Sequence, residues 1–142
     1  MAAGAWTLTN GARTDILNGA APFNSASFKV ALLQSTSNVG AATTTFAGLT
    51  NEVGTTNTGY TAGGLTVTFA EAGTTSVTLK FSNNPVWTAG TANLTARFAA
   101  LYKVSGNVIC FCLLDSTPAD VTATNGNTLT IDGITNAVLT LA

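Results

Sequence analysis

The chain has 142 residues, a formal net charge of −1 and a charged fraction of 8%, where ordinary soluble domains carry about 25%. A dense Lys/Arg surface for phosphates or a polybasic membrane patch is therefore missing, and neither nucleic acid nor a membrane is an expected partner. No apolar run approaches the ~20 residues of a membrane span and no secretory signal is visible, so we expect one domain, residues 1–142, made and kept in a cytoplasm.

The first predicted element is a short helix in TNGARTDILNG, residues 9–19, the only good helix candidate. Thr9 or Asn10 can cap its start and Gly19 can end it. The apolar stripe of this helix would consist of Ala12, Ile16 and Leu17. Residues 20–27 are predicted to form a loop.

After the helix the chain has the two-residue alternation of apolar and polar side chains that is typical of half-buried strands. The predicted strands are 28–34, 64–70, 75–81, 94–104, 108–114, 127–133 and 137–142. Short connections that contain glycine indicate hairpins over 64–81 and 94–114. The strand VICFCLL (108–114) is apolar on both faces, which predicts a central strand covered on both sides.

Strands joined by short turns, with no alternation of strand and long helix, predict an all-β fold. We expect a two-sheet β-sandwich or jelly roll with one short N-terminal helix. The polar stretch 35–63 is interpreted as an excursion from this sandwich and not as a linker, and residues 115–127 as a polar connection.

The two cysteines, Cys110 and Cys112, lie two residues apart in the central strand. Residues at this spacing share one face of a strand at roughly 7 Å, too far for an easy disulfide. We therefore expect buried, reduced thiols that pack as small hydrophobes. The alternative is a Cys-x-Cys metal half-site, which would need further ligands in a chain without histidine.

Acid–base chemistry would fall to the carboxylates, because a chain without histidine has no Ser-His-Asp triad. Asp115 and Asp120 follow the central strand and can converge as a glycosidase-like pair, yet DSTPAD is also turn chemistry, which we favour. A calcium site of Asp115, Asp120 and Asp132 is a further alternative, but the spacing matches no calcium-loop pattern. We expect no enzyme, no metal and no cofactor.

The stretch NEVGTTNTGYTAGGLTVTF, residues 51–69, has several glycines around one aromatic residue and lacks the GK[ST] of a phosphate loop. Gly59, Gly63 and Gly64 are expected to allow a sharp turn into the strand that begins at Leu65.

Two aromatic side chains would have to be exposed in a carbohydrate-binding protein, Tyr60 and Trp87. We expect instead that Tyr60 folds against a neighbouring strand and that Trp87 plugs one end of the sandwich. Long neutral loops on β-sandwiches commonly face a partner. Candidate contact residues are Asn51, Glu52, Tyr60, Gly63 and Gly64, with Trp6 as a second, N-terminal contact.

The order of these motifs resembles a family of small structural proteins of tailed bacteriophages. The most specific pieces are LTNEV (49–53), GYTAGG (59–64), the hairpin RFAALYKVSGNVICFCLLDS and the closing NGNTLTIDGITNAVLTLA. The resemblance is strongest to capsid decoration (cement) proteins. It implies a jelly roll on the outside of the virion head that binds the major capsid protein as a homotrimer, with no catalytic residues.

Two other functions stay open at this point. One is a tail, neck or fibre-associated virion β protein, and the other is a small carbohydrate-binding β-sandwich. The neutral, hydroxyl-rich composition fits a close-packed assembly, since little charge repulsion keeps copies apart.

Overall fold

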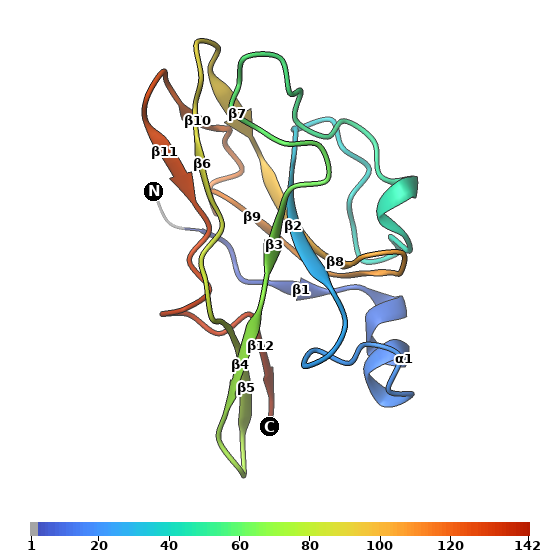
Figure 1. Ribbon diagram of the computed structural model, residues 1–142. Helices are drawn as coiled ribbons and strands as arrows, with labels where there is room; N and C mark the ends of the chain where they lie inside the picture. The colour runs from blue at the N-terminus through green and yellow to red at the C-terminus, as the bar shows by residue number, and fades with distance from the viewer. Residues whose placement is uncertain (1–2) are drawn as a thin grey trace.

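The computed structural model describes residues 3–142, which are mostly β with a single short α-helix (Figure 1). The helical segments are α1 (Asn10–Leu17) and the 3-10 turn η1 (Phe46–Gly48). The strands are β1 (Thr7–Leu8), β2 (Phe28–Leu33), β3 (Leu65–Val67), β4 (Phe69–Ala72), β5 (Val77–Phe81), β6 (Val86–Thr88), β7 (Leu94–Ala96), β8 (Phe98–Lys103), β9 (Val108–Leu113), β10 (Val121–Ala123), β11 (Thr128–Thr130) and β12 (Leu139–Leu141).

One five-stranded antiparallel sheet has the order β1-β9-β8-β2-β3. Three smaller antiparallel sheets have the orders β10-β7, β11-β6 and β12-β5-β4. The main apolar core contains residues of both groups, such as Phe28 and Leu101 from the large sheet with Phe81, Trp87 and Leu129 from the small ones. This arrangement agrees with the predicted all-β sandwich. The β4–β5 ribbon and β12 extend beyond the rest of the molecule at the bottom of Figure 1.

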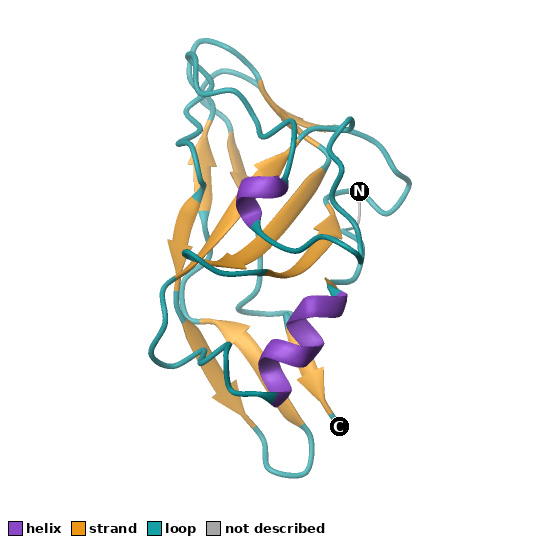
Figure 2. Cartoon of the chain, turned by 90° about the vertical axis from the view of Figure 1, so that its right-hand side faces the viewer, coloured by secondary structure: helices purple, strands orange, loops and turns teal. Residues whose placement is uncertain are grey.

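A second apolar cluster covers the other face of the large sheet. It contains Ala31, Leu33, Ala100, Tyr102 and Val108, against which Phe46 and Leu49 of the 35–63 excursion pack. Figure 2 shows η1 in front of this sheet. The rings of Phe46 and Tyr102 stack with centroids 4.1 Å apart. The excursion is therefore a cover. The predicted central strand 108–114 is β9, whose residues are buried or half-buried on both faces as expected. It lies second in the sheet, between the short edge strand β1 and the middle strand β8.

Two predicted strands are each divided between two sheets, which the alternation did not indicate. Residues 64–70 separate at Thr68, so that β3 pairs with β2 and β4 pairs with β5. At this corner the side-chain oxygen of Asn83 accepts two hydrogen bonds from Thr68, one from the backbone N–H at 2.9 Å and one from the hydroxyl at 2.8 Å. Residues 94–104 separate in the same way at Arg97, between β7 and β8.

The helix α1 is capped as predicted, but its apolar stripe is shorter than expected. The Thr9 hydroxyl oxygen accepts from the Ala12 N–H at 3.1 Å and donates to the Val108 carbonyl at 2.6 Å, which ties the cap to β9. Ala12 is buried, whereas Leu17 is 86% exposed, so the predicted place of Leu17 in the stripe is wrong. An eight-residue helix turns only one narrow face to the core.

Three short strands were not predicted, namely β1, β6 and β10. The sequence interpretation of 115–127 as a plain connection misses β10, which pairs with β7. Trp87 is buried as expected, but it lies within β6 opposite Leu129 and not in an end plug. The thiols of Cys110 and Cys112 are free and buried, as predicted.

Candidate functional site

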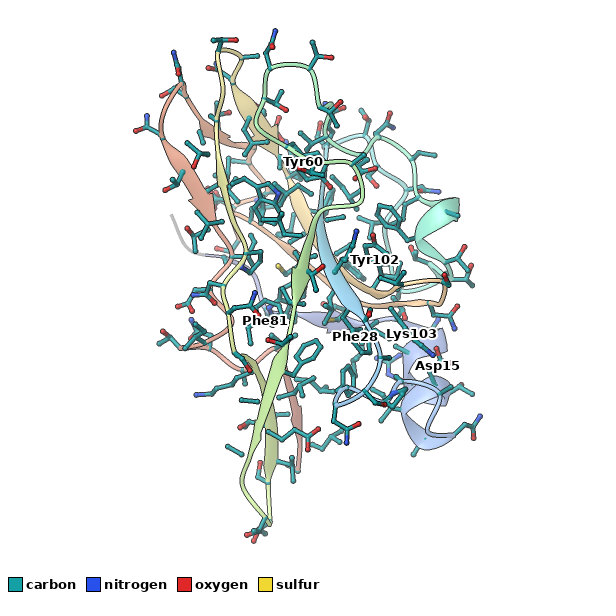
Figure 3. The ribbon with its side chains drawn as sticks, viewed as in Figure 1. Asp15, Phe28, Tyr60, Phe81, Tyr102 and Lys103 are labelled. Atoms are coloured by element: carbon teal, nitrogen blue, oxygen red, sulfur yellow. The ribbon has the colours of Figure 1, made fainter. Side chains whose placement is uncertain are left out.

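The predicted contact loop is organised around the carboxylate of Glu52. Figure 3 labels two of the side chains that take part, Tyr60 and Tyr102. Glu52 Oε1 accepts from the Tyr60 hydroxyl at 2.6 Å and from the Gly63 N–H at 2.5 Å. The Tyr60 oxygen accepts in turn from the Leu32 N–H at 3.1 Å, and Tyr102 donates its hydroxyl to the Gly63 carbonyl at 2.7 Å. The loop is thereby fastened to β2 and β8 by side-chain hydrogen bonds. We call Glu52, Tyr60, Gly63 and Tyr102 the Glu52 network.

The glycines of the loop have the backbone freedom that the sequence predicts. Gly59, Gly63 and Gly64 have φ values of +74°, +79° and +75°, a region that favours glycine. A Cβ atom on Gly64 would also collide with the carbonyl of Val30, and one on Gly59 with the carbonyl of Thr88. The turn into β3 therefore requires glycine for two reasons, conformation and close approach.

The two phenols of the Glu52 network hold their protons more tightly than free tyrosines do. Burial raises the pKa of the Tyr60 phenol well above its ordinary range, and the hydrogen bond and charge of Glu52 raise it further. Burial also raises the pKa of Tyr102, with a smaller contribution from Glu52. Both phenols therefore stay protonated near neutral pH and act as hydrogen-bond donors that fasten the loop.

The predicted contact residues lie at different depths. Tyr60 is only 4% exposed and sits inside the scaffold, while Asn51 is on the surface and donates its side-chain amide to the Thr36 carbonyl at 2.9 Å. Trp87 is 2% exposed, and its ring centroid lies 6.1 Å from that of Tyr60. Neither aromatic ring forms the exposed platform that carbohydrate binding would use.

The carboxylates Asp115 and Asp120 are bonded to different partners. Asp115 accepts from the backbone N–H of Thr117 at 3.0 Å and from its hydroxyl at 2.7 Å, and the backbone bond is the main reason that its pKa lies below the ordinary range. Asp120 forms an ion pair with Arg97 at 2.7 Å. Both therefore hold the connection after β9, as the turn interpretation expects.

Asp132 closes the turn after β11. Its carboxylate accepts from the N–H groups of Ile134 and Thr135, each at 3.1 Å, and from the side-chain amide of Asn84 at 3.0 Å. The backbone bond from Thr135 is the main cause of its lowered pKa. Over residues 3–142, His, Cys, Asp and Glu side chains form no group of three or more that could hold a metal ion.

A groove of about 1090 Å³ lies beside Trp6. It lies between the N-terminal segment 3–8 and the C-terminal segments 121–123, 128–132 and 136–140. The Trp6 ring is half-buried and packs edge-on against Phe81, with centroids 6.2 Å apart. We call this hollow the N-terminal groove. Trp6 is the residue of this groove that the sequence analysis named as a candidate contact.

Comparison of the chain with protein-family models, with curated proteins and with solved structures finds no match. No helix within residues 3–142 has the length and apolar character needed to cross a membrane.

Proposed function

We propose that this protein is a structural component of a tailed-phage virion, a decoration protein that binds the outside of the head and stabilises it. It binds the major capsid protein and acts as a homotrimer. The proposal rests on the resemblance carried by residues 49–53 and 59–64, together with a β scaffold of the kind that the resemblance implies. Such a protein works by binding alone, and simultaneous contacts with several subunits multiply its effect.

The structural observation that carries this proposal is that most carboxylates fix loops and turns of the fold. Five of the six carboxylates accept hydrogen bonds that fix loops or turns; they are Asp15, Glu52, Asp115, Asp120 and Asp132. The exposed residues are mostly Thr, Ser, Asn, Gly and Ala, with a few apolar side chains such as Leu17, Ile134 and Leu141 among them. A rigid neutral body of this kind favours a building block over an enzyme, because its polar chemistry serves the fold.

The experiment that tests the proposal measures the mass of the purified protein in solution and its binding to particles that lack it. We expect a trimer that adds in hundreds of copies to each shell. A few copies at one vertex would instead indicate the tail, neck or fibre alternative. A monomer that leaves the particle bare would reject a virion role.

The carbohydrate-binding alternative is less favoured because Tyr60 and Trp87 are enclosed. A screen of tryptophan fluorescence against a glycan panel tests it directly. We expect no quenching, and a saturable response to one glycan class would revive that alternative.

A further inference from the structure

The N-terminal groove is bounded by the edges of strands. Four runs of consecutive residues line it, 3–8, 121–123, 128–132 and 136–140. The runs include all of β1, β10 and β11 and two of the three residues of β12. Neighbouring side chains of a strand point to opposite faces, so consecutive strand residues that line one hollow bring main-chain atoms to it. The groove therefore offers main-chain groups as well as side chains.

The register of β1 shows where such main-chain groups point. Thr9 donates its N–H to the carbonyl of Ile109 at 3.0 Å, and Leu8 lies opposite Cys110. Opposite residues in an antiparallel pair alternate between hydrogen-bonded and non-hydrogen-bonded positions. Leu8 follows a hydrogen-bonded position, so its own N–H and C=O point away from β9. Leu8 also lines the groove, on the free edge of the five-stranded sheet.

The size and charge of the groove narrow the class of ligand. Its volume of about 1090 Å³ is at or above the range of about 300–1,000 Å³ that small-molecule pockets occupy. The charged residues along it are Arg13 and Asp132, one of each sign. A neutral polypeptide segment in extended conformation fits both features, because it pairs through its backbone and needs no charge.

A second copy of this chain has little to donate to the groove. The longest described stretch without strands is 35–63. Phe46 and Leu49 hold this stretch against the outer face of its own sheet, and the Glu52 network fastens its end. A donor strand would thus come from a different polypeptide.

We propose that the N-terminal groove receives an extended, uncharged strand of the neighbouring capsid subunit, which pairs with the free edge of β1. This inference rests on the proposed function and names the contact through which the head is bound. Strand addition of this kind takes its affinity from main-chain hydrogen bonds and its specificity from alternate side chains.

Two matched lysine substitutions test the site. Thr128 and Thr88 are exposed, lie directly opposite each other in β11 and β6, and differ in that Thr128 lines the groove. A lysine at position 128 would place a long, charged side chain in the groove that the neutral strand is proposed to occupy. We expect Thr128→Lys to weaken binding to particles that lack the protein by about tenfold or more, and Thr88→Lys to stay within about twofold of the unchanged protein.

Hydrogen exchange of the main-chain amides gives the second measurement. In the bound protein we expect slower exchange over 3–8 and 128–132, and unchanged exchange over β6. The groove proposal is wrong if both lysine variants bind the particle equally well and the amides of 3–8 and 128–132 exchange as fast in the bound protein as in the free protein. The decoration role stands in that case, because the protein still binds the particle.

Two other outcomes also overturn the groove proposal. Protection of the same amides in the free protein, rising with its concentration, would show that a second copy fills the groove. If the unsubstituted protein does not bind the particle at all, the decoration role is wrong, and the proposal that a capsid strand enters the groove is wrong with it.

Discussion

Glu52 shows at the scale of single residues how this protein uses charge. One oxygen of its carboxylate receives both the Tyr60 hydroxyl and the Gly63 N–H. We expect Tyr60→Phe to lower the free energy of unfolding by about 1–3 kcal/mol, because the Leu32 N–H and the carboxylate lose their partner in a buried site. Urea denaturation followed by tryptophan fluorescence measures the loss.

Tyr102→Phe is the matched control for that substitution. The Tyr102 hydroxyl makes one hydrogen bond, to the carbonyl of Gly63, which limits the expected loss to about 0.5–1.5 kcal/mol. Equal losses in the two variants would mean that Glu52 does not organise the loop.

The two buried thiols predict a stability that depends on alkaline pH. Burial raises the pKa of Cys112 to about 12 and that of Cys110 well above its ordinary value. In the unfolded chain the thiol pKa is about 8.5. Because the folded-state pKa is higher, each thiol stabilises the folded state fully below about pH 8.5, and this stabilisation is lost as the pH rises toward the folded-state pKa. Between roughly pH 9 and 10 the free energy of unfolding should fall by up to about 1.4 kcal/mol per pH unit for each thiol.

Urea titrations at a series of pH values measure this slope. The variant Cys110→Ala/Cys112→Ala is the control, and its slope below pH 10 should be much flatter, although its stability at pH 7 is lower. An unchanged slope in the double variant would assign the alkaline loss to other groups, such as Tyr60 and Tyr102, whose raised pKa values give a loss of the same sign that begins at about pH 10.

At the scale of elements, periodicity predicted most of the strands but not the sheets to which they belong. Leu65, Val67 and Phe69 continue one alternation although β3 and β4 lie in different sheets. The side chains still point to the same core, so the sequence pattern does not change where the strand passes the corner at Thr68. What marks the corner is the hydrogen bond that Thr68 donates to the side chain of Asn83, fifteen residues away. No local sequence pattern contains this contact.

The turn into β3 gives a prediction at the same scale. Gly64→Ala should destabilise the protein by about 3 kcal/mol or more. The added methyl group would collide with the Val30 carbonyl of β2, and the positive φ at this position is unfavourable for alanine. Gly19→Ala is the control, since Gly19 has φ +69° and nothing within 4 Å of an added Cβ. It should cost about 1 kcal/mol. Chemical denaturation measures both, and similar losses would show that close approach contributes nothing.

At the scale of the whole molecule, the sequence indicated the residues of one candidate surface and only a single residue, Trp6, of the other. The loop residues 51–64 are near neighbours along the chain, so local glycine and aromatic signals indicate their turn. The N-terminal groove joins residues 3–8 to residues 121–140. Its walls include β1 and β10, strands of two and three residues that are too short to show a period. Only the folded chain brings these edges together.

The neutral character of the whole molecule predicts how it binds. With 8% charged residues and a groove that has one charge of each sign, attachment to the particle should come from main-chain pairing and apolar contact. Salt screens exposed charges over about 10 Å at 0.1 M, and contacts without charge are unaffected. We therefore expect the dissociation constant to change by less than about threefold between 50 and 500 mM NaCl. Pelleting of particles with the bound protein at each salt concentration measures it. An affinity that falls steeply and linearly with the logarithm of salt concentration would mean that ionic contacts hold the protein to the head, and the neutral-strand mode of binding would be wrong.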